Sequence, residues 1–476
     1  MTAAITIDPR TLPLTDEDAH TLGKLIAQYN THLNRNITRS NYFEGKHKLR
    51  RLGLTLPAQL RDLDTVVGWP TQAVTTLEQR LDLDGFVRAG QAETDTVLEE
   101  IFTSNNMAIE ASQAHTAALV HGTSFVAVTA PAEPGDPAAV ITVHSALQAT
   151  GLWDARHRCL SAGLIVERHE DSEGAPRRLV VLARDHVTTI LLGKNTRPVV
   201  ETTPHALGRV PMVALSHQPW LEKPFGVSRI SRAVMSMTDQ AVRCIMRTEA
   251  ASEFFSFPQR YILGVDKESA GSEMEMYMNR FLAFEKDEDG DLPKIDQLNG
   301  QGIQPHIDEL RSIAMMFSGE TGIPPSFLGI IHDNPASADA IRAGEAKLVK
   351  IAERDQVIFG ARWCEVANLA LHIATGENAN QHTLRARWKD ASTPTKAAQA
   401  QSVMQLVSAG ILPPTSEITY ELLGYDSTTI SRLVAEAKRR EADDMFASLL
   451  TQTEEEIDQH GGIGEDEAWP HEAVAQ

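Results

Sequence analysis

A run of glycines and prolines separates two strongly helical patterns in the C-terminal half of the chain. Its members, all poorly suited to a helix interior, are Gly319, Gly322, Pro324, Pro325, Gly329 and Pro335. Apolar residues recur at helical spacing over 303–319 before the run and over 337–375 after it. At 1.5 Å per residue the second helix would be roughly 55–60 Å long, with Gly344 and Gly360 as points where it can bend. The patterns therefore predict a helix, a non-helical break and one long helix in succession.

The N-terminal half is predicted to contain helices followed by a β-rich unit. Helical patterns cover 15–37, 70–81 and 94–121, and Thr15 can cap the first of them. Five short β-branched runs come next, separated by Gly, Pro and Asp, at 123–129, 139–143, 162–168, 178–183 and 187–192. This alternation of short strands and turns indicates a small β-rich unit.

The rest of the chain is predicted to be mainly helical. The helical period returns at Gly226 and should end before Pro258, because the residue before a proline disfavours helix. After the long helix, further helices are predicted at 394–410, 416–423 and 427–459. The fold class expected from the whole pattern is α+β, mainly α.

The chain is strongly acidic. Its 476 residues carry 44 Lys and Arg against 64 Asp and Glu, a formal net charge of −20. From Thr451 onward there are eight acids and no Lys or Arg, namely Glu454, Glu455, Glu456, Asp458, Glu465, Asp466, Glu467 and Glu472. Without these eight the charge is still −12, which argues against a generic DNA-coating protein. The length exceeds one ordinary core, so roughly two to four structural units are expected.

The cysteines and the hydropathy place limits on other classes of protein. Cys159, Cys244 and Cys364 are odd in number and far apart, so neither a disulfide framework nor zinc spacing is available. This usage suits a reducing compartment. No stretch approaches the roughly 18 uncharged apolar residues of a membrane span, so none is expected.

The sequence contains no catalytic constellation, and no enzyme activity, cofactor or metal is predicted. It lacks a phosphate loop, a GxGxxG turn after a strand and an HExxH helix. His115 and His121 are six residues apart, on different helix faces, and are predicted to be partly buried histidines rather than metal ligands. Cys364 lies inside the long helix pattern and is predicted to be a structural thiol. The acids at 287–291 are predicted to form a solvated turn rather than a cation site.

Five strings occur in a fixed order along the chain. They are Asn41–His47, Val66–Phe86, Asp95–Val128, Pro224–Ile230, and Thr321–Gly329 followed by Ser337–Trp363. Together they resemble the portal family of long-tailed, siphovirus-type bacteriophages over roughly residues 20–440. The last string is the most specific, because that family has a GVPP…LG segment, a polar loop and a long helix with a late Trp. Phe43 and Trp69 stand where the family commonly has Tyr and Asn, but the family has no catalytic role for either position to disturb.

The resemblance implies a portal fold with wing, stem, clip and crown around a central channel. Mapped onto this chain, the implied domains are the wing at 1–225, the first stem helix at 226–256, the clip at 257–301, the second stem helix at 302–320, the tunnel-loop region at 321–337, the long wing helix at 338–390, the crown helices at 391–455 and an acidic, disordered tail at 456–476.

The resemblance also implies a function. Portal subunits form a ring, usually a dodecamer, at one capsid vertex, and double-stranded DNA passes through the ring during packaging and ejection. The implied partners are the large terminase, which supplies the ATPase, the major capsid and scaffolding proteins, and a head-tail adaptor protein. The implied location is the virion, with assembly in the host cytoplasm. Two other functions stay open, a helical enzyme of unrecognised chemistry and another minor head protein of a phage.

Residues facing DNA are predicted at two places. The resemblance implies a tunnel-loop tip at Ile331, His332, Asp333, Asn334, Pro335, Ala336 and Ser337, with a plain surface loop as the alternative. Basic candidates on the first stem helix are Arg229, Arg232, Arg243 and Arg247, with salt bridges between subunits as the alternative. An otherwise acidic channel would suit this function, because firm phosphate binding would brake moving DNA.

Overall fold

The computed structural model describes residues 4–48, 65–88, 96–168, 175–193, 197–256, 260–263, 294–297, 302–330, 338–376, 384–392, 396–425 and 427–460. About 53% of the chain is helix and 20% is strand, which confirms the expected α+β, mainly α class. The chain divides into two compact units, Met1–Ala391 and Ser392–Gln476, and each is described by itself. No described helix combines the length and the apolar character that a membrane span requires.

Two of the three predicted N-terminal helices of the first unit differ from the structure only at their ends, and the third is divided. The observed helices are α1 (Asp16–Phe43), α2 (Trp69–Glu78), α3 (Thr96–Ser104) and α4 (Met107–His121). Thr15 caps α1, since its side chain accepts a hydrogen bond from the Asp18 backbone N–H. The helix predicted over 94–121 is two helices, because Asn106 adopts a left-handed conformation with φ of 50°. The Asn105 side chain stabilises this break by donating to the Ala139 carbonyl and accepting from the Ile141 N–H.

Two antiparallel sheets follow these helices. The three-stranded sheet has the order β3-β2-β9, with bounds Val140–Ser145, Thr123–Thr129 and Met212–Ser216. The five-stranded sheet is a meander of β4 (Ala149–Asp154), β5 (Cys159–Arg168), β6 (Pro176–Leu182), β7 (His186–Leu191) and β8 (Val199–Pro204). The predicted β-rich unit is therefore present, and β4, β8 and β9 are strands that the sequence patterns missed.

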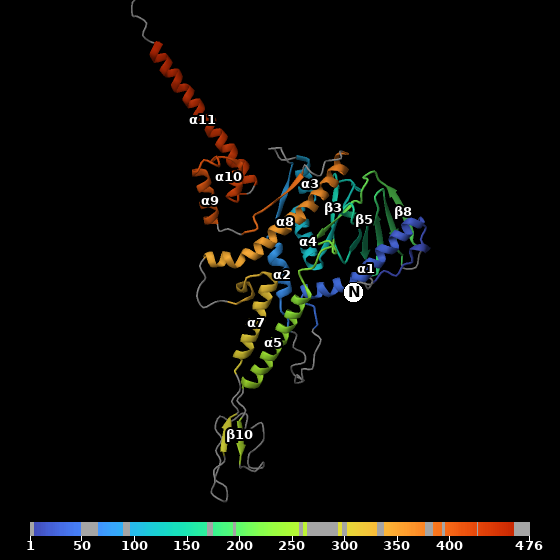
Figure 1. Cartoon of the computed structure of the whole chain (residues 1–476). Helices are drawn as coiled ribbons and strands as arrows, with labels where there is room; N and C mark the ends of the chain where they lie inside the picture. The colour runs from blue at the N-terminus through green and yellow to red at the C-terminus, as the bar shows by residue number, and fades with distance from the viewer. Residues whose placement is uncertain are drawn as a thin grey trace, which may run out of the picture. The chain divides into compact units, whose positions relative to one another are not determined.

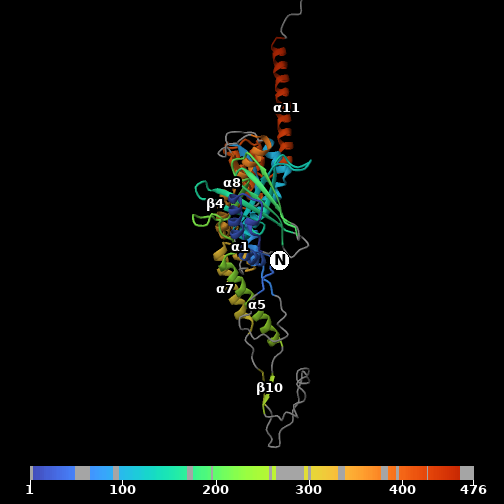
Figure 2. The ribbon, with the colours of Figure 1, turned by 90° about the vertical axis from the view of Figure 1, so that its right-hand side faces the viewer.

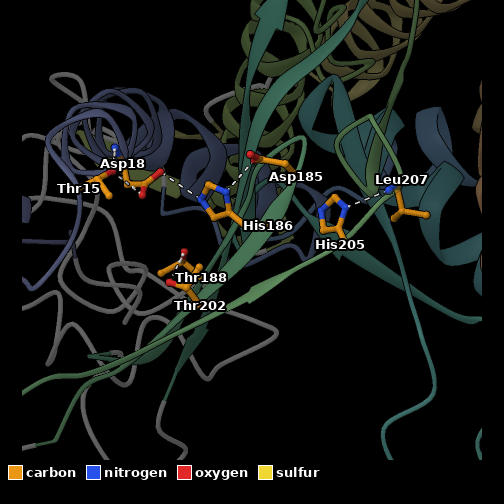
Figure 3. A network of polar contacts seen from close by, with 8 residues as sticks. All are labelled: Thr15, Asp18, Asp185, His186, Thr188, Thr202, His205 and Leu207. Atoms are coloured by element: carbon orange, nitrogen blue, oxygen red, sulfur yellow. Dashed lines mark hydrogen bonds and ion pairs between the residues drawn. The ribbon is translucent and has the colours of Figure 1, made fainter.

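Helix α1 packs on the five-stranded sheet through its apolar stripe. Leu22, Leu25 and Tyr29 are buried against sheet residues that include Leu164 and Leu179. A polar network holds the start of the helix to β7 (Figure 3). In it, His186 lies 3.1 Å from the Asp18 carboxylate and 2.8 Å from the Asp185 carboxylate. Polar contacts thus fix the first turn of the helix to the sheet, and apolar contacts fix the turns that follow.

The remaining elements of the first unit are a pair of helices, a long helix and two short strand pairs (Figure 1). The helices are α5 (Arg232–Ser256), α7 (Gln304–Thr321) and α8 (Ala338–Thr375). Between α5 and α7, β10 (Arg260–Leu263) pairs antiparallel with β11 (Lys294–Gln297). Strand β1 (Leu83–Arg88) pairs antiparallel with β12 (Leu384–Trp388), which is distant from it in the sequence. A short 3-10 helix, η1 (Pro9–Thr11), precedes α1, and a second, η3 (Pro325–Leu328), follows α7.

Helix α5 begins at Arg232, six residues after the predicted start at Gly226. Gly226 has a φ of 65°, which favours glycine, and it lies in the loop that precedes the helix. A Cβ atom at this position would lie 2.2 Å from the His217 carbonyl oxygen and 2.9 Å from that of Gly122. This close approach of three backbone segments, rather than helix geometry, explains the glycine.

Helix α8 forms the centre of the largest apolar core. Phe359 and Trp363 are fully buried, and the His115 ring stacks on Phe359 with 5.0 Å between ring centroids. The Trp388 indole packs closely against α8 at Gly360. A Cβ atom at this position would lie 3.1 Å from the indole nitrogen. The predicted long helix is thus held between α4 and the β1–β12 pair.

The second unit consists of α9 (Lys396–Ser408), α10 (Glu417–Leu422) and α11 (Ser427–His460), as the helical patterns predicted. Ser416 caps α10 by accepting a hydrogen bond from the Thr419 N–H. Val403 and Ile430 are its buried apolar side chains among the described residues. The acidic segment from residue 461 onward lies outside the described residues.

Candidate functional site

Helices α5 and α7 run side by side, as both views show (Figures 1 and 2). Ala241 and Cys244 on α5 and Ile313 on α7 are buried between the helices. Small residues on α5 allow this close packing, and the Cys244 thiol donates to the His306 carbonyl over 3.2 Å. Burial raises the pKa of Cys244, so this thiol is a packing group.

Three of the four predicted stem arginines keep contact with solvent. Arg232 is exposed at the start of α5, and Arg243 is half-buried. Arg247 lies 2.7 Å from the Glu309 carboxylate of α7, and both side chains are 41% exposed. The pair is therefore an intramolecular surface salt bridge across the two helices.

This exposure predicts a small energetic role for Arg247. Replacing Arg247 by alanine is expected to change the free energy of unfolding by no more than about 1 kcal/mol, because exposed ion pairs are weakened by solvent and salt. Urea denaturation of the unassembled subunit measures the change, with Arg232→Ala as the control without this ion pair. A loss well above that of the control would contradict the exposed geometry.

Arg229 is buried and is removed from the set of channel-facing candidates. Its guanidinium donates to the Ala73 carbonyl over 2.6 Å and to the Thr321 carbonyl over 2.7 Å. Burial lowers the pKa of Arg229 to about 10, and the nearby Asp355 carboxylate opposes that shift. Arg229 thus joins α2, the end of α7 and α8, and the helical period alone gave no sign of this role.

Asp355 also faces a buried histidine. His217 Nδ1 lies 2.9 Å from the Asp355 carboxylate, and the two side chains are 3% and 0% exposed. Because His217 follows β9 and Asp355 is on α8, the cluster of Arg229, Asp355 and His217 connects the sheet, the long helix and the loop before α5. Sequence reasoning missed this cluster, since its members are far apart in the chain.

The segment Asn41–His47, the first of the five strings, contacts α5. Tyr42 donates a hydrogen bond to Asp239 over 3.0 Å, and the His47 ring stacks on Tyr42 with 3.8 Å between centroids. Burial is the main cause that raises the pKa of Tyr42, and the hydrogen bond to Asp239 raises this pKa further. The segment Asn41–His47 therefore supports the helix pair, and helix α1 includes its first three residues.

The first glycine of the glycine and proline run, Gly319, lies inside α7, which continues two residues past its predicted end before a defined turn. Gly322 ends α7 with a φ of 75°, and the Ser318 hydroxyl donates to the Ile323 carbonyl over 2.6 Å. The 3-10 helix η3 follows, and Gly329 ends it with a φ of 80°. The predicted tunnel-loop tip, residues 331–337, lies outside the described residues.

The described residues contain no group of three or more His, Cys, Asp or Glu side chains placed to hold a metal. His115 and His121 are buried more fully than predicted, and His115 accepts a hydrogen bond from Trp363 Nε1 over 2.8 Å. Burial lowers the pKa of His115 to about 3 and that of His121 to about 4. These strongly shifted groups lie in the core rather than in a pocket, so they give the enzyme alternative no support.

Comparisons with known proteins point to one family. A family model described as phage portal protein, SPP1 Gp6-like, matches residues 22–439. The portal protein of Mycobacterium phage D29 is 32% identical over 405 residues, which are 79% of this chain and 80% of the relative. The portal protein of Mycobacterium phage L5 is 32% identical over 387 residues, 78% of each chain.

Solved structures from a gene transfer agent particle are also similar. A chain of its native virion aligns with a TM-score of 0.44 and 13% identity over 82% of this chain and 93% of that chain. A chain of its neck, computed with C12 symmetry, aligns with a TM-score of 0.40 and 15% identity over 75% and 90%. The family match and the two phage relatives confirm the resemblance drawn from the five strings, and the chain belongs to the SPP1 Gp6-like family of phage portal proteins.

Proposed function

We propose that twelve copies of this chain form the ring at one capsid vertex through which double-stranded DNA enters and leaves. As a portal family member the chain is a structural protein of the virion. The observation that carries the proposal is the family match, which spans both members of the α5–α7 pair and the long helix α8. No enzyme activity is proposed, because the described residues offer no catalytic arrangement.

In this proposal the α5–α7 pair is the stem, and 257–301 between the helices is the clip. Arg232, Arg243 and Arg247 give weak contacts to passing DNA, and the tip at 331–337 faces the channel. The chain's overall negative charge supports sliding rather than retention, since like charges repel the phosphate backbone. The large terminase docks on the clip during packaging, and a head-tail adaptor replaces it afterwards. Capsid and scaffolding proteins surround the ring, which assembles in the host cytoplasm.

Electron microscopy of the purified full-length chain tests this function. Negative stain is expected to show rings with a central hole wide enough for B-form DNA, and native mass spectrometry is expected to give twelve copies per ring. A chain that stays monomeric at high concentration, in the presence and absence of scaffolding protein, would contradict the proposal. Rings of another number would correct the stoichiometry alone.

A further inference from the structure

A small, partly open pocket lies where β5, the β6–β7 turn, β9 and α8 meet. Apolar side chains that line it include Leu160, Val210 and Met212. Three arginines from three separate segments also line it, namely Arg184 in the turn, Arg209 before β9 and Arg362 on α8. In a chain with 64 acids and 44 basic residues, this concentration of guanidinium groups is unusual.

The arginines exceed the acids that line the pocket. Glu365 is the only carboxylate among the described lining residues, and it lies 2.6 Å from Arg362 and 3.5 Å from Arg209. Arg184 is exposed and has no carboxylate partner in the part of the chain that the structure describes. Three guanidinium groups against one carboxylate leave the pocket with surplus positive charge.

Two further acids lie near the pocket but are not among its lining residues. Asp154 is engaged by His157 at 2.6 Å, and Asp185 by His186 at 2.8 Å. The Arg362 guanidinium is also fixed in place, since it lies 5.5 Å from the centre of the Trp153 ring and donates to the Arg158 carbonyl. Arg362 is therefore preorganised before any ligand arrives, which reduces the entropy cost of binding.

We propose that this pocket receives the carboxylate of an acidic side chain on the neighbouring copy in the ring. The proposal rests on the ring described above, in which each subunit presents one surface to a different surface of the next. The chain carries 64 Asp and Glu residues that can supply such a carboxylate, and arginine binds a carboxylate through two parallel hydrogen bonds. The apolar lining suits the aliphatic stem of such a side chain.

The lining favours a carboxylate side chain over DNA. A phosphodiester backbone would bring several charges past the rim, whereas the lining holds three guanidinium groups, two of which already contact Glu365. The apolar side chains Leu160 and Met212 would contact nothing on a phosphate. A single carboxylate on a short apolar stem satisfies both the arginines and the apolar lining.

Charge reversal at Arg184 tests the proposal in the full-length chain. Arg184→Glu is expected to raise the protein concentration at half-maximal ring assembly by on the order of tenfold or more, because it places like charges together. The matched control is Arg177→Glu, an equal charge change at an exposed position on β6 outside the pocket. Sedimentation and negative stain measure assembly, and circular dichroism of the unassembled chain checks folding.

A second measurement needs no substitution. Cys159 lines the pocket and is partly exposed, so maleimide labelling mapped by peptide mass spectrometry reports whether the pocket is covered. Labelling of Cys159 is expected to fall several-fold on ring assembly. Rings without this protection would overturn the proposal even if Arg184→Glu failed to fold.

The outcomes separate this inference from the proposed function. Wild-type chain that forms no rings would overturn both. Rings formed equally well by wild type and Arg184→Glu would overturn the inference alone, as would equal losses in Arg184→Glu and Arg177→Glu. Normal rings of Arg184→Glu that retain short duplex DNA less well would assign the pocket to phosphate instead.

Discussion

Replacing Asp355 by alanine is expected to lower the free energy of unfolding by about 3–5 kcal/mol, because it leaves a buried charge without its partner. Asp355 is 0% exposed, faces His217 at 2.9 Å and acts electrostatically on Arg229. Without the carboxylate, the Arg229 guanidinium would keep only the two neutral carbonyls of Ala73 and Thr321.

Urea denaturation of the unassembled chain measures this loss, and a second substitution tests its cause. Arg229→Met removes the buried cation, so adding it to Asp355→Ala should cost less than the sum of the two single changes. Glu353→Ala is the matched control on the same helix, since Glu353 is exposed and pairs with Lys350. If Asp355→Ala cost no more than this control, the buried cluster would have no structural importance.

The cluster also has a consequence for the ring. It fixes the loop before α5 to α8 and to the end of α7, so it determines how α5 and α7 connect to the rest of the first unit. A destabilised cluster would change that connection without altering a side chain on the protein surface. Asp355→Ala is therefore expected to reduce ring assembly, although none of the three residues of the cluster lies on an exposed face.

The elements predicted well are those with local causes. The described part of the break begins at Gly322, because α7 continues through Gly319 to Thr321. This turn and the long helix α8 follow from residues that exclude or favour helix within a few positions. The missed strand pair β1–β12 joins residues near 85 to residues near 386, and nothing local to either segment indicates the other. Strand β9 was missed for the same reason, because it pairs with β2 although the five strands of the other sheet lie between them in the sequence.

The site was predicted less fully than the fold. Helical spacing predicted Arg229 and Arg232 on one stem helix. In the structure α5 begins only at Arg232, and Arg229 is buried in the loop that contains Gly226. Residue type and helical spacing cannot distinguish a solvated arginine from one that donates hydrogen bonds to two backbone carbonyls. The cluster around Asp355 and the arginine pocket both depend on segments distant in sequence, so only the structure brings their members together.

Acid is expected to destabilise the fold through two buried histidines. Burial lowers the pKa of His115 to about 3 and that of His121 to about 4, whereas a histidine in an unfolded chain titrates near 6.5. Below pH 6.5 the unfolded chain therefore binds protons that the folded chain excludes, and stability falls as the pH falls. This loss of folding free energy is absent above pH 6.5 and amounts to roughly 5 kcal/mol for the two histidines at pH 4.5.

Urea denaturation at a series of pH values between 7 and 4.5 measures the slope, and His115→Gln identifies its source. Glutamine keeps an acceptor for the Trp363 N–H but does not titrate, so the slope is expected to become shallower, since one of the two most strongly shifted histidines is removed. His20→Gln is the control, because His20 is exposed on α1. A His115→Gln variant that is less stable at neutral pH but keeps the wild-type slope would show that the acid sensitivity arises elsewhere, and that burial of His115 does not resist protonation.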